Sequence, residues 1–278
     1  MQSVIAVIAV IGLVGLFFGV LLAFADKKLA VEMNPLIHVV EDILPKGQCG
    51  ACGFAGCAAY AEAVVLDKDV PPDLCVPGKK AVAQMVAELT GKAAKDIEPR
   101  VAFIRCALPI SAAKKKYQYS GIEDCLAASL LQNGPKECEY GCIGLGTCVK
   151  QCVFGALKLN DQGLPVVDTR KCTGCGKCVS ACPLQVIDLI PVDAHVAVFC
   201  NSHDRGGVVR KYCEVGCIGC SQCSKLCPHG AITMQDNLPV IDAHVCIEKC
   251  QESVCLEKCR RNAIQDYKTH AVEIKKAV

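Results

Sequence analysis

Cysteine is the residue type whose number and spacing could do chemistry in this chain. The 278 residues include 24 cysteines, and many recur at the spacing C-x2-C, which brings thiolates together on one metal ion or cluster. The run from Cys172 to Pro183 is C-x2-C-x2-C-x3-C-P, and the run from Cys217 to Pro228 repeats it. In such a run three thiolates bind one [4Fe-4S] cluster, and the fourth binds the other cluster of a pair. The spacing favours iron–sulfur clusters over zinc, whose sites do not need the third and fourth cysteine followed by proline.

An internal repeat at an offset of 75 residues relates these runs. The segment Cys138–Cys142 matches Cys213–Cys217, but Leu145 stands where the second copy has Cys220, and Arg260 stands where regular motifs have proline. Exchange of the fourth thiolate between neighbouring motifs predicts four ligand sets. They are Cys172, Cys175 and Cys178 with Cys152; Cys138, Cys142 and Cys148 with Cys182; Cys217, Cys220 and Cys223 with Cys259; and Cys246, Cys250 and Cys255 with Cys227.

A separate set of four cysteines precedes the repeat. Cys49, Cys52 and Cys57 are separated by short Gly-rich stretches, and Cys75 follows a Pro-Pro pair. This C-x2-C-x4-C-x17-C pattern predicts one self-contained [4Fe-4S] site, in which the glycines let backbone amides approach the cluster sulfurs.

Four cysteines are left over after these five sets, and one more cluster needs four. We expect them to converge on a sixth [4Fe-4S] cluster that joins the two repeats. The alternative is that they are buried free thiols, which behave as small apolar side chains. The four are Cys106, Cys125, Cys200 and Cys213.

Short elements must position these cysteines. Ala55–Leu66 contains helix formers after a Gly-rich turn, Lys79–Leu89 alternates at helical spacing, and β-branched runs such as Leu164–Val167 predict strands. The predicted fold class is α+β, with one transmembrane helix, a small helical iron–sulfur module and two ferredoxin-like double-cluster units. The predicted divisions are a transmembrane anchor at 1–25, the four-cysteine module at 26–98, a connecting region at 99–137, the first unit at 138–190, the second unit at 191–265 and a tail at 266–278.

The N-terminus predicts a membrane anchor. Val4–Ala25 carries no charge, and its length is sufficient to span a hydrocarbon core of about 30 Å. Ala23-Phe24-Ala25 resembles a signal-peptide cleavage site, but no basic residue precedes the run, and the run is longer than a typical signal-peptide core. Lys27 and Lys28 follow the run, so the positive-inside rule predicts a single-pass protein with a cytoplasmic remainder. Disulfides are not expected in that reducing compartment.

Charge and motifs exclude other functions. The formal net charge is +2, which gives no electrostatic case for nucleic-acid binding. No G-x-G-x-x-G or G-x4-G-K-[ST] motif occurs, so neither a nucleotide site nor a substrate-converting site is expected on this chain. The prediction is an electron conduit, in which the protein supplies spacing, burial and hydrogen bonds to its clusters. An acidic electron donor would need basic patches to dock, and the candidates are Lys114–Lys116, Arg205–Lys211, and Lys249, Lys258, Arg260 and Arg261.

With these motifs the chain resembles the B subunits of the Rnf complexes, membrane ferredoxin:NAD oxidoreductases that couple electron transfer to sodium or proton translocation. The resemblance rests on the N-terminal helix, the CGACGFAGC motif at Cys49–Cys57 with its distant Cys75, and the double-cluster units, and it covers essentially the whole chain. A single double-cluster unit is the shorter form of this subunit, so the second unit is an extension.

The resemblance implies an electron-transfer subunit of the cell membrane that holds [4Fe-4S] clusters. Soluble ferredoxin would be its electron donor, and other membrane subunits its partners. Two alternatives stand beside it. The first is an iron–sulfur subunit of a corrinoid or acetyl-CoA pathway enzyme, which the first module also resembles; the second is a structural metal-binding module.

Overall fold

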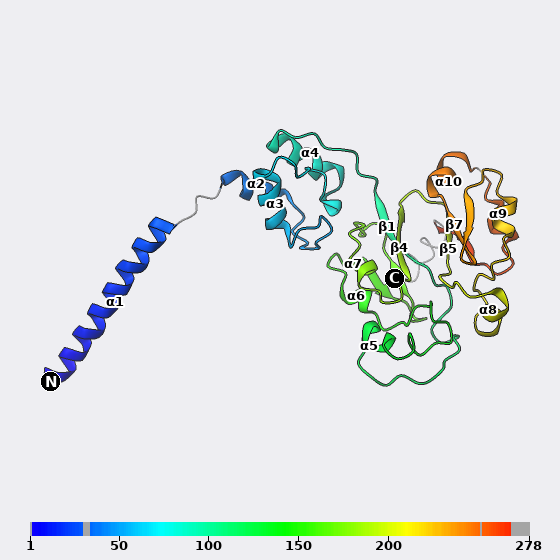
Figure 1. Ribbon diagram of the computed structural model, residues 1–278, viewed down its shortest axis with the longest axis horizontal. Helices are drawn as coiled ribbons and strands as arrows, with labels where there is room; N and C mark the ends of the chain where they lie inside the picture. Colours follow the sequence, from blue (N-terminus) through cyan, green and yellow to red (C-terminus); the bar gives the residue numbers. More distant parts are fainter. Residues whose placement is uncertain (1, 30–33, 251, 268–278) are drawn as a thin grey trace.

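The computed structural model describes residues 2–29, 34–250 and 252–267. It confirms the α+β class: a long N-terminal helix is followed by a small helical module and by two units that each combine two-stranded sheets with short helices (Figure 1). The N-terminal helix and the second unit lie at opposite ends of the molecule (Figure 1).

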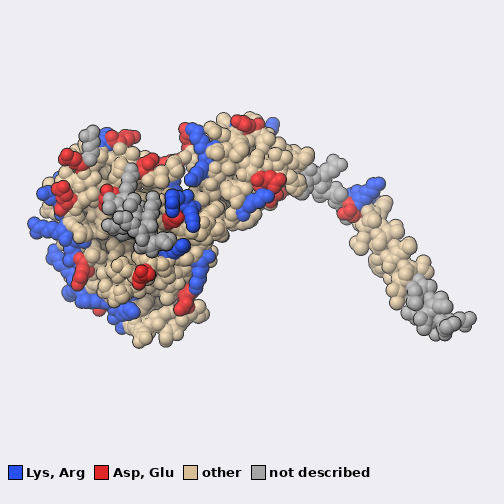
Figure 2. Space-filling view, turned by 180° about the vertical axis from the view of Figure 1, so that it is seen from behind, with Lys and Arg blue, Asp and Glu red and all other residues tan. Residues whose placement is uncertain are grey.

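Helix α1 (Gln2–Leu29) stands apart from the rest of the chain (Figure 1). Its segment Val10–Lys28 has a mean hydropathy of 2.0 and is long and apolar enough to cross a membrane. None of this segment is buried against the protein, and Figure 2 shows its charged side chains only at the end that leads into the rest of the chain. Such a continuous apolar surface is stable in lipid rather than in water.

The first module is a cluster of short helices around one apolar core. The helices predicted at Ala55–Leu66 and Lys79–Leu89 are confirmed, as α3 (Cys57–Leu66) and α4 (Lys79–Thr90). The Tyr60 hydroxyl, at the centre of the core, donates to the Pro71 carbonyl at 3.0 Å. The module is completed by α2 (Pro35–Ile43) and the 3-10 turn η1 (Val76–Gly78), and its most buried side chains are Val40, Tyr60, Ala61, Val64 and Val86.

The first unit begins with a strand from the predicted connecting region. Strand β1 (Arg100–Ile104) pairs antiparallel with β4 (Ile187–Pro191), so residues 99–137 contribute a strand to this unit as well as leading into it. Ile104 lies opposite Ile187 in the register. The other elements are the hairpin of β2 (Leu157–Leu159) and β3 (Pro165–Val167), and the helices α5 (Cys125–Ser129), α6 (Thr147–Lys150) and α7 (Lys177–Ser180).

The second unit repeats this plan. Strand β5 (Val196–Val198) pairs antiparallel with β8 (Ile264–Asp266), with Val198 opposite Ile264. The other elements are the hairpin of β6 (Ile232–Gln235) and β7 (Leu238–Ile241), and the helices α8 (Gly206–Tyr212), α9 (Gln222–Leu226), α10 (Ala243–Lys249) and α11 (Val254–Lys258).

An aromatic cluster joins the two units. The Phe103 ring of β1 packs edge to face on Phe199, with ring centroids 4.8 Å apart, and on Tyr267, with centroids 5.6 Å apart. All three residues are buried together with Val101 and Ala197. Aromatic pairs of this geometry contribute about 0.5–1.5 kcal/mol beyond their burial. The two sheets therefore share one apolar core.

Candidate iron–sulfur sites

The 24 cysteines form six groups of four. A buried thiol has a raised pKa, and neighbouring thiolates raise it further because like charges repel. This effect acts among the members of each group, and at Cys49, Cys142, Cys178 and Cys217 it also acts between neighbouring groups. The Cys75 group is Cys49, Cys52, Cys57 and Cys75; the Cys178 group is Cys152, Cys172, Cys175 and Cys178; the Cys148 group is Cys125, Cys142, Cys148 and Cys182; the Cys138 group is Cys106, Cys138, Cys200 and Cys213; the Cys220 group is Cys217, Cys220, Cys223 and Cys259; the Cys255 group is Cys227, Cys246, Cys250 and Cys255.

The Cys75 group gathers in the first module as the spacing predicts. Burial raises the pKa of Cys75 to about 11, and the other three thiolates of the group add to the rise. The loop that carries them is held by Gln48, whose side-chain oxygen accepts a hydrogen bond from the Cys57 amide at 2.8 Å. A Cβ at Gly56 would lie 2.3 Å from that oxygen, so glycine leaves the space that Gln48 needs.

The first unit directs backbone amides at its thiols. The Ala156 amide donates to the Cys152 sulfur, and the Val186 amide to the Cys182 sulfur, each at 3.3 Å and each four residues after the cysteine. Amide donors of this kind stabilise negative charge on sulfur and are one of the levers on a cluster's potential. Burial also raises the pKa of Cys178 to about 12, with Cys172 and Cys175 contributing.

Cys125 completes the Cys148 group. It begins α5, where its amide donates to the Thr147 hydroxyl at 2.7 Å, and that hydroxyl donates to the Asp124 carboxylate at 2.9 Å. These bonds tie α5 to α6, which carries Cys148. Burial raises the pKa of Cys148 to about 12, and Cys125 is the first of the neighbouring thiolates that add to the rise. The four thiols line one hollow of about 420 Å³, which includes space open to solvent.

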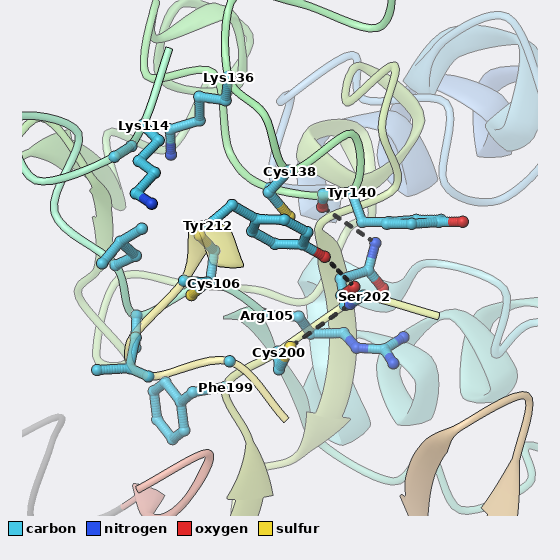
Figure 3. Close-up of a pocket in the computed structure, with 18 residues that line it drawn as sticks. Arg105, Cys106, Lys114, Lys136, Cys138, Tyr140, Phe199, Cys200, Ser202 and Tyr212 are labelled. Carbon is cyan, nitrogen blue, oxygen red and sulfur yellow. Dashed lines mark hydrogen bonds between the residues drawn. The ribbon is translucent and has the colours of Figure 1, made fainter. Parts of the chain in front are cut away.

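The Cys138 group lies between the two units. Its four thiols line a hollow of about 430 Å³, and Figure 3 shows Cys106, Cys138 and Cys200 around it. Burial raises the pKa of Cys138 to about 12, and the three other thiolates of the group raise it further. The Tyr212 hydroxyl, which donates to Asp204 at 2.8 Å and lies 2.8 Å from the Ser202 hydroxyl, borders the same hollow.

The structure groups the thiols differently from the predicted ligand sets at two positions, Cys125 and Cys138, which exchange places. The prediction assigned Cys138 to the first unit because Leu145 had removed a ligand there. The structure fills that vacancy with Cys125, from 20 residues earlier in the chain, and leaves Cys138 for the junction. One signal in the sequence could have shown this: Cys138 matches Cys213 in the repeat, and the two positions now serve the same group.

The junction group consists of two equivalent pairs. Cys106 and Cys200 each stand two residues after β1 and β5, and the residues between make the same bond: the Arg105 amide donates to the Val186 carbonyl and the Phe199 amide to the Ala263 carbonyl. Cys138 and Cys213 are the second pair. Each unit thus contributes one thiol from just after its first strand and one from its repeat motif.

The second unit holds two groups that share two helices. Helix α9 carries Cys223 and is followed by Cys227, while α11 carries Cys255 and is followed by Cys259. Burial raises the pKa of Cys255 to about 11, with Cys246, Cys250 and Cys227 contributing. The Cys220 group lines a larger hollow, of about 1060 Å³ including space open to solvent.

The donor sets fit [4Fe-4S] clusters. Each group offers four thiols and no other ligand type, and in three groups the four thiols surround one hollow. Across the described residues, no three His, Cys, Asp or Glu side chains have the close spacing of ligands on one metal ion. Thiolates that repel one another when bare are the ligands that a positively charged iron core holds together.

Family models match two parts of the chain. One, described as "Putative Fe-S cluster", matches residues 44–77 and so spans the Cys75 group. The other, described as "4Fe-4S binding domain", matches residues 165–188 and 216–233, one segment in each of the two units.

Known proteins resemble the chain over most of its length. The chain is 57% identical to the B subunit of the proton-translocating ferredoxin:NAD(+) oxidoreductase complex of Clostridium ljungdahlii, over 95% of this chain and 93% of the relative. It is 43% identical to the B subunit of the ion-translocating oxidoreductase complex of Methanosarcina acetivorans, over 86% and 90%. It is 38% identical to the B subunit of the Na(+)-translocating ferredoxin:NAD(+) oxidoreductase complex of Acetobacterium woodii, over 90% and 77%. These names favour an electron-transfer subunit over the corrinoid-pathway and structural-metal alternatives.

Proposed function

We infer the function of this chain from the family to which it belongs, the B subunits of ion-translocating ferredoxin:NAD(+) oxidoreductase complexes. The chain is an electron-transfer subunit with [4Fe-4S] domains, and its partners are other subunits of such a complex. We propose that it holds six [4Fe-4S] clusters, one on each group of four cysteines. We also propose that it accepts low-potential electrons from soluble ferredoxin, and that it has no nucleotide site.

The observation that carries this proposal is the serial arrangement of the six groups. Electrostatic effects on thiol pKa values connect neighbouring groups: Cys175 acts on Cys49, and Cys148 acts on Cys178. Cys106 acts likewise on Cys142 of the next group. These three connections support a single path through the Cys75, Cys178, Cys148 and Cys138 groups.

The path continues from the junction into the second unit. Cys200 acts on the pKa of Cys217, and the Cys217 amide donates a hydrogen bond to Cys200. Helices α9 and α11 then connect the Cys220 and Cys255 groups, since each helix positions one cysteine of both. The order is the Cys75, Cys178, Cys148, Cys138, Cys220 and Cys255 groups, with the Cys75 group nearest in sequence to the membrane helix.

The clusters, when bound, supply one-electron transfer. The chain's own residues bury the thiols, exclude water from them and direct amides at their sulfurs, among them the Ala102 amide on Cys172 at 3.4 Å and the Ser202 amide on Cys200 at 3.5 Å. Such burial and hydrogen bonds determine how much negative charge on sulfur is stabilised at each site. We further propose that α1 crosses the membrane once, with Lys27 and Lys28 and everything after them in the cytoplasm.

Iron content tests the six clusters. We expect anaerobically purified chain to contain about 24 iron atoms, four for each of six clusters, against about 20 for five. Cys-to-Ala variants then test the grouping. The double variant Cys125→Ala/Cys148→Ala should lose no more iron than either single variant, because both residues serve one cluster.

The matched double variant Cys125→Ala/Cys138→Ala should lose iron additively, because these residues serve different clusters. The low-temperature EPR spectrum of dithionite-reduced protein should show the same pattern of lost signals. Additive loss in the first double variant, or shared loss in the second, would contradict the grouping; a chain with about 20 iron atoms would contradict the sixth cluster.

A further inference from the structure

The Cys220 group contains the most exposed thiol of the six groups. Cys220 is the one exposed cysteine among the 24, all of which lie in the described residues. The hollow that its group lines, about 1060 Å³ with its opening to solvent, is more than twice the size of those of the Cys138 and Cys148 groups. Electron transfer between proteins requires a close approach to the cluster, and this group permits it.

Three exposed cations line that hollow. Arg210 comes from the last turn of α8, Lys258 from the last residue of α11, and Arg260 from the position where a regular motif has proline. All three are exposed, and no ion pair involves them within the described residues. Their positive charges are therefore available to a partner.

Neighbouring cations are already engaged. Arg261 lines the same hollow, but its guanidinium donates to the Gly216 carbonyl at 3.4 Å and to the Cys213 carbonyl. In the other basic run of the sequence, Lys114 donates to the Lys211 carbonyl, and Lys116 donates to the Glu139 carboxylate at 2.9 Å. Lys114 and Lys116 are thus engaged in hydrogen bonds within the chain, so the run Lys114–Lys116 is not a free basic patch.

The Cys255 group, at the end of the path, lacks this excess of exposed cations. Beside its cysteines, exposed Glu248 and Glu252 flank exposed Lys249, and Lys225 is exposed two residues before Cys227. Exposed cations are thus more numerous around the hollow of the Cys220 group, which Arg210, Lys258 and Arg260 line. Figure 2 shows Lys and Arg side chains gathered along the edge of the molecule that this unit forms, at the end opposite α1.

We propose that the surface around Cys220, bounded by Arg210, Lys258 and Arg260, docks a small acidic iron–sulfur protein. The docked carrier gives up one electron and is oxidised; the cluster of the Cys220 group gains that electron and is reduced, with no bond made or broken. This inference rests on the proposed function, since it names the entry point for the ferredoxin donor. It also gives Arg260 a role that the cluster motif itself does not require.

Charge reversal tests the surface on the full chain with its clusters. Reduced 2[4Fe-4S] ferredoxin is mixed anaerobically with the oxidised chain, and cluster bleaching near 400 nm is followed by stopped flow. The triple variant Arg210→Glu/Lys258→Glu/Arg260→Glu should lower the second-order rate constant by at least about tenfold at low ionic strength. The difference should shrink as added salt screens the charges. Lys158→Glu, which reverses an exposed lysine on the β2 hairpin of the first unit, is the control matched in charge to Arg210→Glu alone and should leave the rate unchanged.

Folding is checked separately because two of the cations flank Cys259. The iron content of each variant, and its EPR spectrum after dithionite reduction, should match those of the unaltered chain. If the triple variant loses iron, the test uses Arg210→Glu alone, because Arg210 lies outside the ligand loops. This single variant should lower the rate constant at least about threefold. If the unaltered chain is not reduced by ferredoxin, the proposed donor itself is wrong. If it is reduced rapidly and the Arg210 and triple variants behave like the Lys158 control, the donor stands and this docking surface is wrong.

Discussion

Lys136 is a cation buried among thiols. Only 4% of its surface is exposed, and it lines the hollow of the Cys138 group. Burial raises the pKa of Cys142, and the Lys136 ammonium opposes that rise. One side chain thus lines the hollow of the Cys138 group and acts electrostatically on Cys142 of the adjacent Cys148 group. Figure 3 shows it on the same side of the hollow as Lys114.

We expect Lys136→Met to lower the reduction potential of at least one cluster, because a nearby positive charge favours the reduced and more negative state. An interaction of about 1 kcal/mol corresponds to roughly 40 mV for one electron. Redox titration followed by EPR measures the shift, and Lys158→Met serves as an exposed control. Unchanged potentials in a variant with full iron content would show that Lys136 has no electrostatic role.

At the scale of elements, Lys92 holds the first module together. Its ammonium donates to three backbone carbonyls, those of Val64 at 2.7 Å, Asp67 at 2.6 Å and Val70 at 2.7 Å. These carbonyls lie at and beyond the end of α3, where the last turn of a helix has no intrahelical donors and a cation is favoured. The other end of α3 carries Cys57, so the capped helix fixes one thiol of the Cys75 group.

We expect Lys92→Met to lower the local free energy of unfolding of α3 by about 2–3 kcal/mol, since it leaves three carbonyls without their charged donor. Hydrogen exchange of the α3 amides reports this free energy directly. The control is Lys95→Met, an exposed lysine three residues later, which should leave the exchange rates unchanged. Equal protection in both variants would mean that the three bonds contribute little.

At the scale of the whole molecule, the charges at the end of α1 predict its orientation. Lys27 and Lys28 follow the apolar segment in the last turn of the helix, and basic residues next to a span remain in the cytoplasm. In inside-out membrane vesicles, protease added outside should therefore digest the chain after residue 28, whereas right-side-out vesicles should protect it. The converse pattern, or recovery of mature chain in the soluble fraction, would contradict a retained anchor with a cytoplasmic remainder.

The sequence by itself determined the chemistry and the repeating plan. Thiol spacings such as Cys172–Cys182 and Cys49–Cys57 predicted the cysteine groups that gather locally, and helical periodicity predicted α3 and α4 to within two residues. These features depend on neighbours along the chain, where a few residues of loop or helix fix which side chains meet. The apolar N-terminal helix was equally evident, because its length and composition alone specify it.

Only the tertiary structure decided which distant thiols meet. Cys125 reaches the Cys148 group through the Asp124–Thr147 hydrogen bonds, and Cys106 and Cys200 reach the junction because β1 pairs with β4 and β5 with β8, across long stretches of the chain. Motif spacing carries no information on such pairings, since the cost of closing a long loop changes only slowly with its length. Packing selects among the possible partners, and here the shared core of Phe103, Phe199 and Tyr267 brings the two units together and places four thiols between them.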